Sequence, residues 1–208
     1  MDAESSWRAI AGQRRSLADL LEGLTPAQWE APSLCAGWRV RDVVAHTMSY
    51  EGMPFGALAR RFLKGRLQTD RINELAVADM SATSPAELVD TVRKYAEPSG
   101  LGAGFGGRIA LTDNMIHQQD IRRVLGAPRV IAVERLFVAL DFVRWAPLIR
   151  GAWRARGVRL VATDVDWSAG TGPEVRGPGE ALLMVMAGRR DALTDLDGPG
   201  LTKLAARL

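Results

Sequence analysis

Apolar residues recur every three or four positions along the chain up to about residue 155, and this spacing predicts a series of amphipathic helices. The clearest case lies near the N-terminus, where Trp7, Ile10, Leu17 and Leu21 follow the spacing and Gly23 ends it. Helices of this kind pack one apolar side against a shared core. The predicted helices cover residues 5–23, 26–30, 38–48, 55–64, 84–96, 108–125 and 133–152.

Residues typical of helix ends support several of these bounds. Thr25 is followed by a proline, and Ser84 precedes a proline with Glu87 three positions later, which is the pattern of a capping box. Residues 126–128 read Gly-Ala-Pro and predict the end of the helix before them. Pro147 is expected to bend the last turn of the helix predicted over 133–152.

After Gly157 the pattern changes from helical spacing to alternation. Residues 158–163 alternate and are rich in β-branched side chains, which predicts a strand. A hairpin-type turn at 170–173 and a returning strand at 174–176 are expected next, followed by a helix over 178–187. We therefore expect a mainly α protein, with a helical bundle at 1–155 and a small α+β domain at 156–208.

A glycine-rich stretch lies between two of the predicted helices. Gly102, Gly104 and Gly107 match the spacing of the dinucleotide-binding fingerprint. That fingerprint requires a preceding strand inside a βαβ unit, and here a charged helical segment precedes the glycines. We therefore interpret the stretch as a flexible connection and not as a nucleotide site.

The composition indicates where the protein works more clearly than which reaction it performs. The chain has 208 residues and a net charge of +3, with its basic residues dispersed, so nucleic-acid binding is only weakly indicated and is not expected. Cys35 is the single cysteine, which excludes an internal disulfide and fits a reducing cytoplasm. The apolar runs are too short for a membrane span.

The two histidines are the most informative residues for chemistry. Asp113 and His117 stand four apart on a predicted helix, so their side chains share one face. His46 lies on another predicted helix, beside its apolar face. A carboxylate and two imidazoles that meet inside a helical bundle form a three-ligand site for a divalent metal.

Several simpler readings remain open for these residues. A buried histidine bonded to a backbone carbonyl, beside an exposed aspartate, is the common role of such a pair. Asp120 lies three residues after His117 and is expected to bond either its imidazole or an arginine such as Arg123. Asp42 and His46 repeat the four-residue spacing, and Asp42 is either a surface or orienting residue or a fourth ligand. Cys35 is either a buried apolar residue or a catalytic thiol.

Five motifs together resemble one known family, the mycothiol-dependent maleylpyruvate isomerases of actinobacteria. The order of the motifs along the chain matches that family, and together they extend over most of its length. The motif at 157–167 is the most specific of them. They are WRVRDVVAH at 38–46, DNMIHQQDIR at 113–122, GVRLVATDVDW at 157–167, GPGEALL at 177–183 and AGR at 187–189.

The resemblance implies a DinB-like four-helix metal-binding domain followed by a small C-terminal α+β domain. It implies a divalent metal, usually zinc, held here by His46, Asp113 and His117. The family pattern has glutamate where this chain has Asp113, which is one methylene shorter. Arg189, in the last motif, is implied as a partner for a substrate carboxylate. The alternative for Arg189 is an arginine stabilised by the C-terminus of a helix.

The resemblance further implies an enzyme that uses mycothiol as a thiol cosubstrate. The thiol attacks an electrophilic or carboxylate-bearing small molecule, in either cis–trans isomerisation or S-transfer. The alternative is a non-catalytic member that binds or senses a metal or a small molecule. We expect no nucleic-acid or membrane partner, and a monomer or a homodimer.

Overall fold

The computed structural model describes residues 3–146 and 149–208, and it divides into two compact units, residues 1–128 and 129–208. The division falls earlier in the chain than the domain boundary that we expected near residue 155, which stays a prediction. Pro147, which we expected to bend a helix, lies outside the described residues. No helix among the described residues is both long and apolar enough to cross a bilayer.

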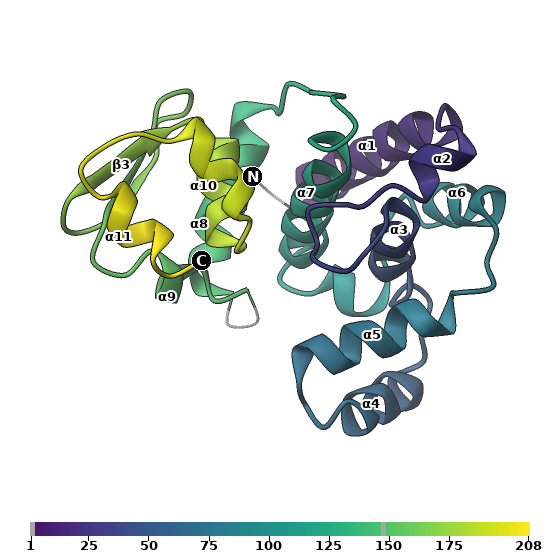
Figure 1. Cartoon of the computed structure of the whole chain (residues 1–208). Helices are drawn as coiled ribbons and strands as arrows, with labels where there is room; N and C mark the ends of the chain where they lie inside the picture. Colours follow the sequence, from purple (N-terminus) through teal and green to yellow (C-terminus); the bar gives the residue numbers. More distant parts are fainter. Residues whose placement is uncertain (1–2, 147–148) are drawn as a thin grey trace. The chain divides into compact units, whose positions relative to one another are not determined.

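The first unit is helical throughout (Figure 1). Its elements in chain order are α1 (Ala3–Glu22), α2 (Pro26–Trp29), α3 (Val40–Met48), α4 (Phe55–Lys64), α5 (Thr69–Asp79), α6 (Pro85–Lys94), the 3₁₀ turn η1 (Gly100–Ala103) and α7 (Arg108–Arg122). Four of these helices form a closed square, because α1 packs against α6 and α7, and α3 packs against the same two. The expected four-helix bundle is therefore confirmed.

The core of this bundle comes from the predicted apolar faces. Buried side chains of α1, α3, α6 and α7 fill its centre. They include Leu17, Leu21, Val40, Val43, Val44, Met48, Leu88, Val92 and Ile121. The cap predicted at Thr25 and the capping box predicted at Ser84 are present, and each side chain accepts a bond from the backbone three residues later.

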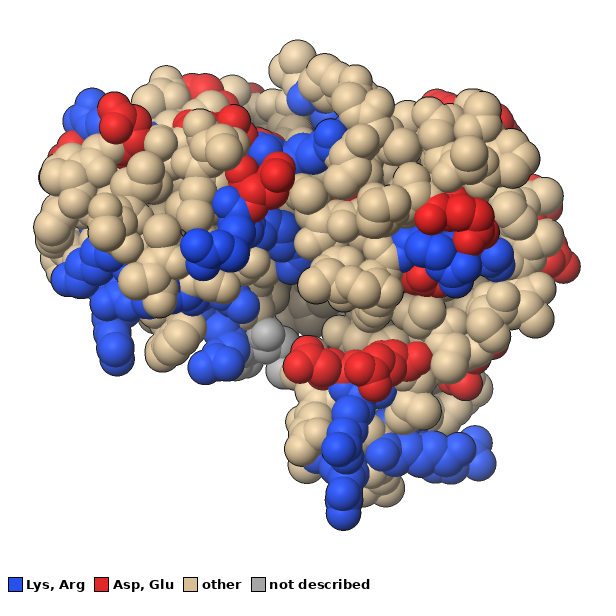
Figure 2. Space-filling model, in the orientation of Figure 1, with Lys and Arg blue, Asp and Glu red and all other residues tan. Residues whose placement is uncertain are grey.

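Helix α5 was not predicted, and with α4 it forms an addition to the bundle. It packs against α3 on one side and α4 on the other. Figure 2 shows basic side chains gathered where α4 lies in Figure 1, and α4 carries the exposed Arg60 and Lys64. Elsewhere on the face shown over this unit, basic and acidic side chains are interspersed.

The second unit is the small α+β part, and it begins with a helix. Its elements are α8 (Val133–Trp145), α9 (Gly151–Arg154), β1 (Arg159–Ala162), β2 (Ser168–Gly170), β3 (Glu174–Gly177), α10 (Gly179–Met186), the 3₁₀ turn η2 (Arg190–Asp195) and α11 (Leu201–Ala205). Helix α10 is the centre of this unit, because it packs against α8, β1 and β3. The predicted class, mainly α with a small C-terminal α+β part, is confirmed.

The returning strand pairs differently from our prediction. The described residues hold a three-stranded sheet of order β2-β1-β3, in which β1 runs antiparallel to β2 and parallel to β3. The turn at 170–173 is therefore not a hairpin, because it carries the chain from β2 across the end of β1 to the opposite edge of the sheet. Gly170 and Gly172 have positive φ angles of 85° and 122°, and a Cβ on either would collide with a backbone carbonyl at the start of β1. Glycine lets the chain cross close to β1 and pair on its other edge.

Candidate metal centre

The first candidate ligand, His46, lies near the end of α3 and points into the bundle. Only 7% of its surface is exposed. Its ring contacts the rings of Trp38 and Tyr50, with centroids 5.0 Å and 5.8 Å away. These two aromatic side chains restrict the orientation of the imidazole and shield it from water.

Asp113 and His117 lie one turn apart on α7, as their spacing predicted. Nε2 of His117 is 3.4 Å from Oδ1 of Asp113. The side chain of His117 is 11% exposed and that of Asp113 is 40% exposed. The imidazole is therefore inside the bundle, while the carboxylate leaves one side of the group open to solvent.

The three predicted ligands come together in the structure. The rings of His46 and His117 have centroids 4.9 Å apart and are nearly perpendicular, at 78°. One potential ligand atom from each of His46, Asp113 and His117 lies within 4.8 Å of the others. Two ligands bonded to one tetrahedral zinc at ~2.0 Å lie about 3.3 Å apart, so the 3.4 Å between His117 and Asp113 fits such a pair. The carboxylate of Asp113 is therefore close enough to His117 for both to bind one ion.

The charges in this group favour an ion pair when no metal is bound. Burial disfavours the charged imidazolium, but the Asp113 carboxylate and the hydrogen bonds that the ring makes to Asp113, Asp120 and Cys35 outweigh it and hold the pKa of His117 well above its usual value. Burial raises the pKa of Asp113, but His117, His46 and Arg14 outweigh it and the pKa is lowered overall. A metal at this site would compete with a proton for His117.

Two further side chains lie behind His117, and one of them was not expected there. Oδ2 of Asp120 is 2.9 Å from Nδ1 of His117, which is the first of the two roles that the sequence left open for Asp120. Sγ of Cys35 is 3.0 Å from the same oxygen. Cys35 is 82 positions before His117, in a loop without periodic pattern, so no local signal in the sequence connects the two.

Asp42 has another partner, although it stands four residues before His46. Its carboxylate accepts bonds from Nε and Nη2 of Arg39, at 2.9 Å and 3.0 Å, and from the backbone N–H of Arg39. These bonds hold the pKa of Asp42 below its usual value in spite of burial, which alone would raise it. The structure therefore places Asp42 at the first turn of α3 with an arginine.

Arg189 belongs to the second unit, at the end of α10. Its Nη1 donates to the carbonyl of Ala187 at 2.7 Å, which is one of the last carbonyls of that helix. This contact matches the helix-end alternative. A role for Arg189 in binding a substrate carboxylate stays a prediction.

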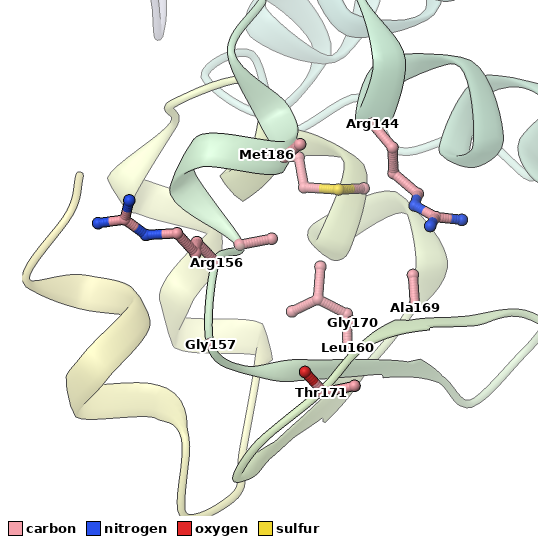
Figure 3. A pocket seen from close by; sticks show the side chains of 10 residues that line it. Arg144, Arg156, Gly157, Leu160, Ala169, Gly170, Thr171 and Met186 are labelled. Carbon is pink, nitrogen blue, oxygen red and sulfur yellow. The ribbon is translucent and has the colours of Figure 1, made fainter.

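The second unit also contains a small cavity of about 160 Å³. Leu160 and Met186 lie between Arg144 and Arg156, whose guanidinium groups are on opposite sides (Figure 3). None of the predicted site residues lines this cavity. The cavity therefore adds nothing to the predicted metal ligands, which lie in the first unit.

Comparison with known families supports the resemblance found in the motifs. Residues 10–98 match the family model described as the mycothiol maleylpyruvate isomerase N-terminal domain. No curated protein matches the chain. The matched segment includes His46 and ends before α7, so it contains one of the three predicted ligands.

Two solved structures share the fold. One is a crystal structure of a histidine-to-alanine mutant of the mycothiol-dependent maleylpyruvate isomerase, with a TM-score of 0.61, 15% identity, and coverage of 96% of this chain and 93% of that one. The other is a crystal structure of the mycothiol-dependent maleylpyruvate isomerase, with a TM-score of 0.51, 15% identity, and coverage of 91% and 90%. The likeness extends over both units, and the resemblance that the motifs indicated is confirmed.

Proposed function

Because residues 10–98 belong to the family of mycothiol maleylpyruvate isomerase N-terminal domains, we propose that this chain is a metal-dependent enzyme that uses mycothiol to attack an electrophilic small molecule. The observation that supports the proposal most directly is the convergence of His46, Asp113 and His117 in the bundle. Two imidazoles and a carboxylate are ordinary zinc ligands, and three protein ligands leave a fourth position for a substrate.

His46, Asp113 and His117 would hold the metal ion in this proposal. A divalent ion with an open position lowers the pKa of a bound thiol, which then reacts as a thiolate near neutral pH. Trp38 and Tyr50 restrict the ring of His46 and keep water from one side. The exposed edge of Asp113 leaves the group accessible to a thiol from solution.

The reaction that fits is an addition to an activated carbon–carbon double bond. The thiolate sulfur bonds to one carbon, and the electron pair of the double bond moves onto the activating carbonyl group as an enolate. The former double bond is then a single bond that can rotate. Departure of the thiolate restores the double bond in the trans form, so no thiol is consumed. In S-transfer the sulfur stays, and a proton from solvent is added to the neighbouring carbon.

The first experiment measures metal by mass spectrometry in the purified protein and in the variants His46→Ala and Asp42→Asn. We expect about one zinc per chain in the wild type and in Asp42→Asn, and a loss in His46→Ala. Asp42→Asn is the matched control because Asp42 has the same spacing to a histidine but is bonded to Arg39. Equal metal content in all three proteins would contradict the proposed ligands.

The second experiment tests turnover of maleylpyruvate and related electrophiles with and without mycothiol. The proposal requires a rate that depends on both the metal and the thiol. Mycothiol-dependent conversion to a trans isomer identifies an isomerase, and a stable thioether identifies an S-transferase. A zinc-loaded protein that turns over no electrophile would favour the binding or sensing alternative and contradict the enzyme.

A further inference from the structure

The predicted ligand His117 has a carboxylate on each edge of its ring. Nε2 faces Asp113 at 3.4 Å, and Nδ1 faces Asp120 at 2.9 Å. We propose that Asp120 is the positioning residue of His117, with the thiol of Cys35 as a second donor to the same oxygen, so that Nε2 is directed toward His46 and Asp113. This inference rests on the proposed function, because it assigns a role within the same site.

The position of one proton decides whether His117 can bind a metal. A neutral imidazole carries its proton on one nitrogen, and only the other has a lone pair to donate. A carboxylate that accepts from Nδ1–H keeps the proton there and leaves Nε2 available. The shorter contact is the one to Asp120, so the geometry favours the tautomer that binds a metal through Nε2.

Burial makes the contact with Asp120 stronger than a surface contact. The side chain of Asp120 is 0% exposed, and a buried carboxylate is costly unless donors surround it. Sγ of Cys35 donates to Oδ2 of Asp120, and Nδ1 of His117 lies 2.9 Å from the same oxygen. The backbone carbonyl of Asp120 also accepts from the N–H of Leu34, at 3.2 Å, which fixes the loop that carries Cys35 against α7.

The distances separate this role from a second metal site made of Cys35, His117 and Asp120, whose ligand atoms also lie within 4.8 Å of one another. Zinc ligands at bond lengths of ~2.0–2.3 Å in a tetrahedron lie at least about 3.3 Å apart. The contacts of Asp120 with His117 and Cys35 are 2.9 Å and 3.0 Å, which are hydrogen-bond lengths. One neutral imidazole also cannot serve both groups, since it has one lone pair.

The decisive variant is Asp120→Asn, which keeps the shape and removes the charge. With Asp120 neutral, Asp113 becomes the stronger acceptor, so the proton should move to Nε2. We expect zinc affinity, measured by competition with a chromophoric chelator, to fall about 10–100-fold. In the metal-free protein at alkaline pH, where the imidazole is neutral, nitrogen–proton correlation NMR should report the proton on Nε2 instead of Nδ1. A merely structural residue would not reverse the tautomer.

Variants of Cys35 test whether its thiol donates a hydrogen bond to Asp120 or binds the metal. Cys35→Ser keeps a donor and should bind zinc as the wild type does, while Cys35→Ala should lose only about 2–3-fold because the carboxylate remains. With Co²⁺ as the probe, the wild type should show no sulfur-to-metal charge-transfer band. Such a band, abolished in Cys35→Ser, would make Cys35 a ligand and overturn the proposal.

The outcomes distinguish this inference from the proposed function. A wild type that binds zinc, with Asp120→Asn binding equally well and keeping its proton on Nδ1, overturns the positioning role and leaves the function intact. A wild type that binds no zinc contradicts the proposed function, and the tautomer in the metal-free protein still tests Asp120. Should Asp120→Asn not fold, the wild type alone decides, because a proton on Nε2 at alkaline pH contradicts the proposal.

Discussion

The same four-residue pattern, an aspartate followed by a histidine, occurs in α3 and in α7, and the two copies have different environments. In α7, Asp113 contacts His117 and lies beside His46. In α3, Asp42 turns to Arg39 at the start of the helix, and His46 points into the bundle without it. Spacing on one helix thus permits a pair but does not create one, because the neighbouring elements decide which residue each side chain meets.

The largest effect is expected from removing the histidine that α7 contributes. His117→Ala removes a ligand, separates Asp113 from its partner and leaves Asp120 without its ring donor. We expect zinc affinity to fall by more than about 100-fold, beyond the range of outer partners. His46→Ala removes one ligand but keeps the contacts of His117 with Asp113 and Asp120, so its loss of zinc affinity should not exceed the loss in His117→Ala. Competition with a chelator measures the zinc affinity of both variants. Equal zinc binding by the wild type and His117→Ala would contradict the proposal that the aspartate–histidine pair of α7 holds the metal.

Exchanging the two aspartates for asparagine compares the copies directly. Asp113→Asn should weaken zinc binding by about 10–100-fold, because an amide oxygen is a poorer ligand than a carboxylate. Asp42→Asn should change it by less than about 2-fold, since Asp42 is bonded to Arg39. The conservative change Asp113→Glu restores the residue of the family pattern and should keep binding. Equal losses in both asparagine variants would show that Asp42 also supports the metal.

The pH dependence of zinc binding should follow the protonation of His117. Its pKa is raised well above the usual value, so the metal-free protein holds this proton at neutral pH, and zinc must displace it. Zinc affinity should therefore rise about tenfold per pH unit below that pKa and level off above it. Titrations in two buffers of different ionisation enthalpy should report about one proton released. An affinity independent of pH would mean that His117 is already neutral.

The smallest effect concerns the stability of α3. Asp42→Asn weakens the acceptor of the Arg39 backbone and guanidinium, so the free energy of unfolding should fall by about 1 kcal/mol. Urea denaturation of the metal-free protein measures it. Asp113→Asn serves as the comparison, and it should lose its stabilising pairing with His117 only below the raised pKa of that imidazole. If Asp42→Asn lowered the free energy of unfolding more than substitution of any metal ligand, the start of α3 would contribute more to stability than the metal site.

The sequence predicted the bundle because its four helices carry strong local signals. The apolar spacing of α1 and α3 and the capping box of α6 appear within single stretches of chain. Helix α5 was missed because it buries little, with Ile72 and Ala76 as its buried residues. A short helix with so narrow a buried face has no clear period.

What remained unpredicted depends on contacts between distant residues. The pairing of β3 with β1 follows from the close crossing at Gly170 and Gly172, and a turn pattern alone does not distinguish that from a hairpin. Cys35 meets Asp120 across 85 positions, from a loop without a period. The ligands His46, Asp113 and His117 were predicted as a set because the chain has only two histidines, both on predicted helices with an apolar face, and the family motifs implied the same set.

The buried pair of Arg14 and Glu51 has a consequence for biosynthesis. Arg14 donates to Glu51 and to the carbonyl of Tyr95, and Glu51 accepts from Ser99, so the pair joins three distant parts of the chain. Arg14 is synthesised before Tyr95 and Ser99, and burial of its charge before then would remove water without supplying all of its native acceptors. We therefore expect the bundle to close only after most of the first unit has been synthesised.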